Sequence, residues 1–324
     1  MQKQKNTKKI NAHGVLPIFK PKGVISKDVS RWILRTFGKV KLGHVGTLDP
    51  MAEGVLPVLL GKATRLQDYL LDSNKIYEFD IEFGYETTSL DADGEVLERC
   101  EYSHVTRDAI DQACESLVGQ YIQTPPLYSA IKYKGKPLYE YAREGRSSEV
   151  PLDLLKKTVN IFSCICSKFE NNIATITIEC SKGTYVRSVG QSIAKKCDSL
   201  ATTVRLLRKQ SAGLNASQCV SMSELEEKVD EFSRFVIPME NIVFDLPDWT
   251  SYDEVIVQKL KHGQKIQIDM VNFESGFLKD EERRMTLTSI DKLMLREPNG
   301  KLFGIGSATI QNNGLVQLSM KRGL

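Results

Sequence analysis

The stretch GHVGTLDPMAEGVLPVLLGKATRL, residues 43–66, is the most informative part of this sequence. A polar segment punctuated by Gly43 and Gly46 carries His44 and Asp49 and runs directly into an apolar strip. An aspartate before a proline most often caps its own turn. Here, however, the glycines let the backbone approach a bulky partner closely. The apolar strip would also place the carboxylate at the mouth of a dry pocket, where it needs a cationic partner such as Arg187 to stay ionised.

Regular elements are expected on both sides of this stretch, from apolar residues at helical or strand spacing. The strand predicted over 75–86 is the clearest, because polar residues alternate there with an apolar face of Tyr77, Phe79, Ile81 and Phe83. Ser26 is a candidate N-cap for a helix. The sequence predicts helices over 26–38, 62–73, 105–118, 185–197, 221–232 and 251–263, strands over 14–20, 75–86, 95–99, 201–213 and 301–310, a hairpin over 159–183 around Asn171-Asn172, and a loop over 38–57.

The mixture of many strands with few helices favours an α+β fold over an alternating βαβ fold. After Gly213 the composition changes, and an acidic helix leads into a proline-containing connection. We predict a first domain over residues 1–248, of which 1–13 form a basic and flexible tail, and a second, smaller domain over 249–324.

Composition excludes several classes of protein. The chain has 324 residues, 41% of them hydrophobic and 26% charged, as in globular proteins. No apolar segment suits a signal peptide or a membrane span, so we expect a soluble, cytoplasmic protein. The seven cysteines form no CxxC pair, which favours reduced thiols and no metal site.

Two glycine-containing segments fail as nucleotide-binding motifs. GVLPVLLGKA has six residues between its glycines instead of four, and Ala63 stands where a phosphate loop needs serine or threonine. GIGSAT lacks the third glycine of a dinucleotide fingerprint. An NTPase or a dehydrogenase is therefore not expected.

Basic residues are concentrated locally, although the net charge is only +3. Residues 1–27 contain lysines and no acid, and residues 182–209 are rich in lysine and arginine. Such patches attract polyanions, but charge runs are usually only solvated faces. In PPLYSAIKYKGKPLYEYAREGR (125–146), tyrosines alternate with cations. This pattern suits unstacked bases on a charged backbone, or equally a hairpin and helix with half-buried tyrosines.

The stretch over 43–66 resembles the catalytic motif of the TruB family of tRNA pseudouridine synthases. Further segments resemble family blocks in family order: FKPKGVIS, KIYEFDIEFG, PPLYSAIKYKGKPLYEYAREG, SKGTYVRS and VRLLRK. The final unit, with FGIGSA, resembles the family's PUA-like RNA-binding domain. The resemblance implies a pseudouridine synthase fold, with a central mixed or antiparallel sheet flanked by helices.

The resemblance also implies a reaction, the conversion of uridine to pseudouridine at position 55 in the T-loop of tRNA. It implies no metal, no cofactor and no protein partner, and we expect a monomer that binds the tRNA T-arm. The implied roles are as follows: Asp49 is the catalytic carboxylate, Arg187 holds it charged, Tyr77 stacks on the flipped uracil, Tyr185 lies near C5, Leu207 supplies an apolar wall, and His44, Lys20, Lys132 and Arg208 contact RNA.

The sequence departs from the family pattern at three places. Phe19 precedes Lys20-Pro21 where aspartate is usual, Ile25 replaces threonine, and Thr88 replaces the aspartate of a Thr-Asp-Thr segment. The missing carboxylate at Thr88 puts one supporting contact in question. Two alternatives remain: an RNA-binding or tRNA-folding protein with secondary or lost catalysis, and a guide-RNA-dependent relative that acts within a ribonucleoprotein.

Overall fold

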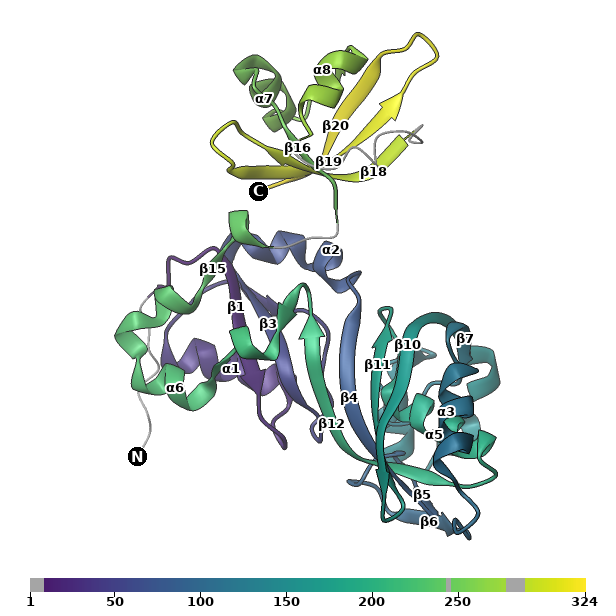
Figure 1. Ribbon diagram of the computed structural model, residues 1–324. Helices are drawn as coiled ribbons and strands as arrows, with labels where there is room; N and C mark the ends of the chain where they lie inside the picture. Colours follow the sequence, from purple (N-terminus) through teal and green to yellow (C-terminus); the bar gives the residue numbers. More distant parts are fainter. Residues whose placement is uncertain (1–8, 243–245, 278–288) are drawn as a thin grey trace.

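The computed structural model describes residues 9–242, 246–277 and 289–324 (Figure 1). The expected basic tail therefore lies largely outside the described residues. Two main sheets organise the described chain, one of eleven strands and one of five. Figure 1 shows the smaller sheet with its helices above the end of the larger one. In the part of the chain described, no helix is long and apolar enough to cross a membrane.

The larger sheet is mixed and follows the order β14-β1-β3-β12-β4-β11-β10-β7, with β2, β13 and β15 paired at its side. The pairs β1–β14 and β3–β12 are parallel, and the other pairs are antiparallel. Its strands are β1 (Gly14–Lys20), β2 (Leu42–His44), β3 (Glu53–Leu60), β4 (Lys75–Phe83), β7 (Gly119–Gln123), β10 (Lys157–Glu170), β11 (Ile173–Cys180), β12 (Ala201–Ser211), β13 (Leu214–Asn215), β14 (Val220–Ser221) and β15 (Ile237–Pro238).

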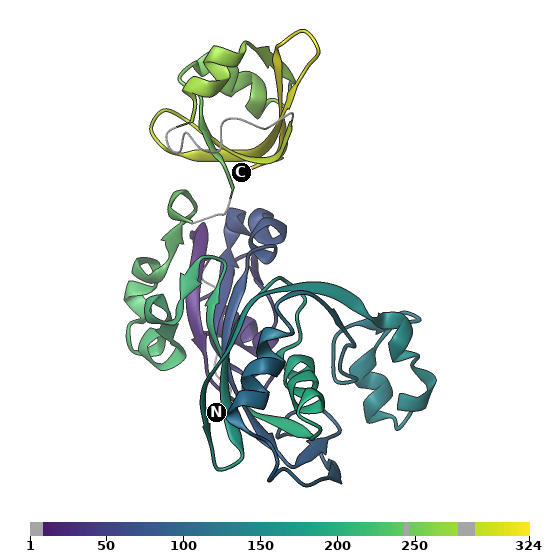
Figure 2. The same ribbon diagram turned by 45° about the vertical axis from the view of Figure 1, so that its right-hand side comes forward.

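Helices and short hairpins surround this sheet. The helices are α1 (Ser26–Thr36), α2 (Gln67–Leu71), α3 (Arg107–Glu115), α4 (Leu138–Arg143), α5 (Val186–Lys196) and α6 (Met222–Glu227), with 3-10 turns η1 (Gly61–Leu66), η2 (Ser147–Glu149), η3 (Leu152–Leu155), η4 (Ala216–Gln218), η5 (Val229–Phe235) and η6 (Met239–Asn241). The hairpins are β5 (Tyr85–Thr87) with β6 (Val96–Arg99), and β8 (Lys132–Tyr133) with β9 (Lys136–Pro137). Helices α3 and α5 lie together beside β10, β11 and β4 (Figures 1 and 2).

The strand alternation predicted over 75–86 is confirmed by β4. Phe79, Ile81 and Phe83 are buried in the main core, together with Val189 and Ile193 from α5. The whole first turn of α5 is buried, from Val186 to Gly190, and Ile193 and Ala194 continue the buried face one turn later.

The loop predicted over 38–57 is wrong in both halves, because it contains β2 (Leu42–His44) and because β3 begins at Glu53 and runs through the sheet. Pro57, the last residue of the predicted loop, lies opposite Pro17 of β1. The two prolines share one position of the ladder, so pairing continues on either side of it. The N-cap prediction at Ser26 is also wrong: the cap residue is Ile25, and the Ser26 hydroxyl contacts Leu48 instead.

The C-terminal unit contains β16 (Asp248–Thr250), α7 (Glu254–Lys261), β17 (Ile266–Ile268), α8 (Met270–Ser275), β18 (Ser289–Arg296), β19 (Leu302–Ile310) and β20 (Val316–Gly323). Its strand order is β16-β18-β19-β20-β17. The unit has its own core around Trp249 and Leu260. A second core crosses to the larger sheet, where Met294 and Ile305 pack with Leu66 and Leu70. The division of the chain after residue 248 stays a prediction.

Residues 124–156 form a small separate body. Leu138, Tyr141 and Val150 are buried in a cluster of their own. In Figure 2 this teal segment stands away from the sheet at the right. Its two ends flank the cavity described next, since Ser129 and Lys157 belong to the cavity lining.

Candidate active site

A cavity of about 630 Å³ opens beside β4, β12 and the start of α5. Ligand pockets for small organic groups have volumes of this order. Its lining brings together Asp49, Tyr77, Tyr185 and Arg187, which are separated by up to 138 positions in the chain (187 minus 49). The four residues expected to act on the substrate thus lie around one space.

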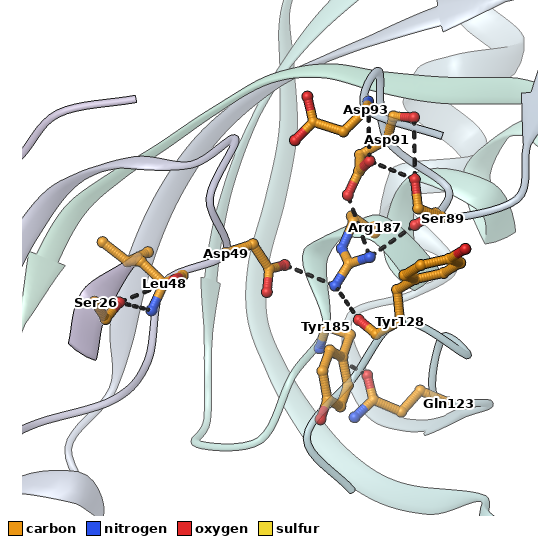
Figure 3. A network of polar contacts seen from close by, with 10 residues as sticks. All are labelled: Ser26, Leu48, Asp49, Ser89, Asp91, Asp93, Gln123, Tyr128, Tyr185 and Arg187. Carbon is orange, nitrogen blue, oxygen red and sulfur yellow. Dashed lines mark hydrogen bonds and ion pairs between the residues drawn. The ribbon is translucent and has the colours of Figure 1, made fainter. Parts of the chain in front are cut away.

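Arg187 is the centre of the polar network in this cavity (Figure 3). Its side chain is 3% exposed, and Nη2 lies 2.7 Å from Oδ2 of Asp49. Nη1 lies 3.3 Å from Oδ2 of Asp91, which is itself buried. Nη1 also donates to the Ser89 carbonyl at 2.7 Å, and Nη2 donates to the Tyr128 carbonyl at 2.9 Å. One guanidinium therefore fixes two carboxylates and two backbone segments.

Asp49 is the more accessible of the two carboxylates, with a side chain 35% exposed against 7% for Asp91. Within the residues that the structure describes, Oδ1 of Asp49 has no hydrogen-bond partner, and Figure 3 shows it turned away from Arg187. The arrangement leaves one charged oxygen available to a molecule in the cavity.

The segment that carries Asp91 is held in an unusual backbone conformation. Leu90 has φ +62°, which is uncommon for a side chain of its kind. Its neighbours are Ser89 and Asp91, and both contact Arg187, one by its carbonyl and the other by its carboxylate. The left-handed conformation of Leu90 lets the Ser89 carbonyl and the Asp91 carboxylate face the same guanidinium. Strained backbone of this kind is often retained at functional sites.

Burial raises the pKa of Asp91, while its hydrogen bond from Ser89 and its ion pair with Arg187 oppose that effect. Thr88, in place of the family's usual aspartate, lies in the adjoining hairpin, where its hydroxyl accepts a hydrogen bond from the Glu95 N–H at 3.2 Å. The carboxylate that supports Arg187 comes from Asp91.

The loop that carries Asp49 is anchored on three sides. The hydroxyl of Ser26 accepts from the Leu48 N–H at 2.9 Å. Buried Arg208 donates to the Gly46 carbonyl at 3.0 Å and to the Val55 carbonyl at 2.7 Å. Buried Lys20 donates to the Val24 carbonyl at 2.7 Å and approaches the Pro50 carbonyl at 3.5 Å.

The contact expected between Lys20 and RNA is wrong for this reason. Lys20 is 0% exposed, and its ammonium faces the Val24 and Pro50 carbonyls. A cation enclosed in this way supports the backbone around it and cannot reach an RNA backbone at the surface. Arg208 is 1% exposed but belongs to the cavity lining, so its contact with RNA stays a prediction. Lys132 is exposed, so its contact with RNA stays a prediction.

The apolar wall expected from Leu207 comes from its neighbour. Leu206 lines the cavity together with Arg208, two positions on, because alternate residues of β12 face the same side. Leu207 pairs with Glu78 on the opposite face of the sheet from Tyr77. His44 lies at the end of β2, 3.4 Å from the Thr47 hydroxyl, and its role toward RNA stays a prediction.

The two tyrosines present half-buried rings to the cavity. Burial raises the pKa of Tyr77, opposed by nearby Arg208, and burial likewise raises the pKa of Tyr185. Both phenols therefore remain protonated near neutral pH. Tyr185 is fixed by its backbone N–H, which donates to Oε1 of Gln123 at 2.9 Å.

Sequence reasoning missed three residues of this site: Asp91, Leu206 and Lys75. Asp91 stands two positions before Asp93, where a turn is expected, and nothing in the local pattern marks it as buried. Lys75 is 4% exposed, lines the cavity and donates to the Leu71 carbonyl. The signal in the sequence that could have identified Lys75 is its place at the start of a strand with an apolar face.

Gly54 is required by the close approach of β3 to β12. It has φ +109°, and a Cβ there would lie 2.3 Å from the Arg208 carbonyl oxygen. We expect Gly54→Ala to lower the free energy of unfolding by about 3 to 5 kcal/mol, from backbone strain and overpacking together. Gly183→Ala is the matched control, since its φ is +82° and its Cβ would meet nothing within 4 Å. The control should cost about 1 to 2 kcal/mol. If urea unfolding shows equal losses of unfolding free energy for Gly54→Ala and Gly183→Ala, steric overlap at Gly54 is not the cause.

Lys20 makes stability depend on pH. Burial lowers the pKa of Lys20 from 10.5 to about 8, although the negative charge of Asp49 opposes this. Between these two values the unfolded chain binds more protons than the folded one, so the free energy of unfolding rises with pH. Relative to Lys20→Met, the wild type should gain about 1 to 3 kcal/mol between pH 8 and 10.5. Parallel stability curves for the two proteins, measured by urea unfolding, would show that Lys20 titrates normally.

Comparison with known proteins shows the family of this chain. The sequence profile of "TruB family pseudouridylate synthase (N terminal domain)" matches residues 34–186. A tRNA pseudouridine synthase B from Ligilactobacillus salivarius (strain UCC118) is 40% identical over 244 residues, covering 72% of this chain and 80% of that protein. Another from Vibrio parahaemolyticus serotype O3:K6 (strain RIMD 2210633) is 34% identical over 290 residues, covering 86% and 90%.

Solved structures share the fold. A chain of the structure described as "Crystal Structure of a Cbf5-Nop10-Gar1 Complex" superposes with a TM-score of 0.68 at 25% identity, over 93% of this chain and 80% of that chain. The two relatives above exceed 30% identity over more than two thirds of the chain. This protein therefore belongs to the TruB family of pseudouridine synthases and is an isomerase.

Proposed function

We propose that the protein isomerises uridine to pseudouridine at position 55 in the T-loop of tRNA. The observation that carries the proposal is a carboxylate, Asp49, held by Arg187 with one oxygen facing a cavity large enough for a nucleoside. The names of its relatives support tRNA as the substrate. The first unit, residues 1–248, would carry the reaction, and residues 249–324 would form a PUA-like RNA-binding domain.

The target base must leave its stack to enter the cavity. Tyr77 then stacks on the uracil, and Leu206 closes the apolar side of the cavity. The C1′–N1 bond breaks, the uracil turns, and a C1′–C5 bond forms. The proton on C5 is lost and N1 gains one, so substrate and product have the same composition.

Asp49 is the catalytic residue in this scheme, acting on the ribose as nucleophile or as base. Arg187 keeps it ionised and aimed, because a buried guanidinium within ion-pair distance favours the charged carboxylate. Tyr185 lies near the position where the C5 proton departs. Asp91 acts as a positioning residue through Arg187.

The test is tritium release from a tRNA transcript labelled at uracil C5, with purified protein and no other component. Release approaching one equivalent per tRNA is expected, and a transcript with cytidine at position 55 should give none. Release from the transcript with cytidine at position 55 would show that another uridine is modified. No release from either, with tight tRNA binding, would favour an RNA-binding or tRNA-folding protein. Activity on bare tRNA would exclude a guide-dependent enzyme.

A further inference from the structure

Asp72 joins two lysines that come from different units of the protein. It follows α2 directly, and its Oδ1 pairs with Lys182 while its Oδ2 pairs with Lys292. Lys182 lies in the turn before α5 and lines the active-site cavity. Lys292 lies in β18 of the C-terminal unit. One carboxylate therefore holds an ammonium group of the cavity rim beside an ammonium group of the second unit.

All three groups remain open to solvent. The side chains are 58% exposed for Lys182, 43% for Lys292 and 34% for Asp72. Lys292 is also held by the ring of Tyr69, whose centroid lies 5.7 Å from its Nζ. Exposed ion pairs contribute little to stability, so two of them on one residue invite a role other than holding the fold.

The surroundings of Asp72 carry excess positive charge. Lys75 follows Asp72 by three residues, and its ammonium donates to the carbonyls of Leu71 and Ser73. Three lysines thus gather around one carboxylate. Burial raises the pKa of Asp72, but its hydrogen bonds and ion pairs with Lys182 and Lys292 prevail and hold it below the ordinary value. The carboxylate stays charged at neutral pH and neutralises only part of the cluster.

A nucleotide whose base is flipped into the cavity leaves its phosphates at the cavity mouth, where cations are needed. A phosphate offers two non-bridging oxygens, as a carboxylate does, and lysine binds phosphate as a point charge. We propose that Lys182 and Lys292 form a binding site for one backbone phosphate of the RNA, occupied by the Asp72 carboxylate in the free protein. This inference rests on the proposed function, since it needs RNA at the cavity.

The proposal predicts opposite effects of two substitutions on RNA affinity. Asp72→Asn removes the competing negative charge and frees both lysines, so it should tighten RNA binding by about two- to fivefold at low salt. Lys292→Ala removes one phosphate contact, so it should weaken binding and reduce the salt slope of log K by about 0.7 to 0.9. If the bridge serves only to hold the two units together, both substitutions break it and must shift affinity in the same direction.

Binding of a fluorescent tRNA transcript would be measured from about 50 to 300 mM salt, a range over which phosphate contacts change affinity strongly, for wild type, Asp72→Asn, Lys292→Ala and the double variant. Lys265→Ala is the matched control, because Lys265 is an exposed lysine of the same unit, next to the far sheet edge formed by β17. We expect the tRNA affinity to rise in Asp72→Asn and to fall in Lys292→Ala, and the affinity of the double variant to lie between the two. Shifts of the same sign, or an unchanged salt slope in Lys292→Ala beside Lys265→Ala, would overturn the phosphate site.

Tritium release by the same proteins separates this inference from the proposed function. If wild type releases tritium and the single variants shift affinity together, only the phosphate site fails. If wild type neither binds nor modifies the transcript, the proposed function itself fails. Thermal unfolding of each variant, expected within a few degrees of wild type for exposed side chains, confirms that differences in affinity do not reflect unfolding.

Discussion

Asp49→Asn is expected to reduce turnover at least about 10⁴-fold while leaving tRNA affinity within a few-fold of wild type. The amide is nearly isosteric with the carboxylate but has neither its charge nor its basicity. Arg187, Ser89 and Asp91 would keep their contacts, so the site should keep its shape. Single-turnover tritium release and filter binding would measure the two quantities.

Asp28→Asn is the control for Asp49→Asn, because Asp28 forms an exposed ion pair with Arg31 on α1. That variant should show wild-type turnover. Residual turnover of a tenth or more in Asp49→Asn would mean that the carboxylate is not the reacting group. A parallel collapse of tRNA affinity would instead assign Asp49 to binding.

Arg187→Met is expected to have the second large effect, on stability and on turnover together. Its removal leaves Asp91 buried without its cation and frees the Ser89 and Tyr128 carbonyls. Removing one partner of a buried pair costs about 3 to 5 kcal/mol. Asp49 would also lose the partner that orients it. A misplacement of a catalytic group by about 1 Å costs roughly 10²-fold in rate.

Arg187→Lys separates the two effects, since it restores the charge but not the fork that reaches four groups. It should recover part of the stability and little of the turnover. Arg31→Ala, at an arginine 59% exposed, should cost no more than about 1 kcal/mol. If Arg187→Met unfolds at the same urea concentration as wild type, the charge network does not support the fold.

The elements with strong periodicity and the residues in long motifs could be predicted from the sequence. The alternation in β4 and the apolar spacing in α5 predict both elements, and the motifs assign Asp49 and Arg187 to one site, where they form an ion pair. Prediction fails where tertiary contacts decide. Pro57 marks a loop locally, but pairing of β3 with β1 on one side and β2 on the other overrides that preference.

The charged residues show the same limit. The family resemblance assigns Lys20 and Arg208 to RNA, and lysine and arginine normally face solvent. Both are buried instead. Lys20 donates to the Val24 carbonyl nearby in the chain, and Arg208 donates to the carbonyls of Gly46 and Val55, far from it in the chain. The one-residue error at Leu207 has a similar origin, since a strand without a known neighbour does not reveal which of its faces lines a cavity.

The core shared between the two units has a thermodynamic consequence. Leu66 and Leu70 pack against the larger sheet and also against Met294 and Ile305 of the C-terminal unit. Separating the units would hydrate all of this apolar surface, and the penalty grows with the area exposed. We therefore expect loss of either unit to weaken the other, and the described chain to unfold in one cooperative transition rather than as two modules that melt independently.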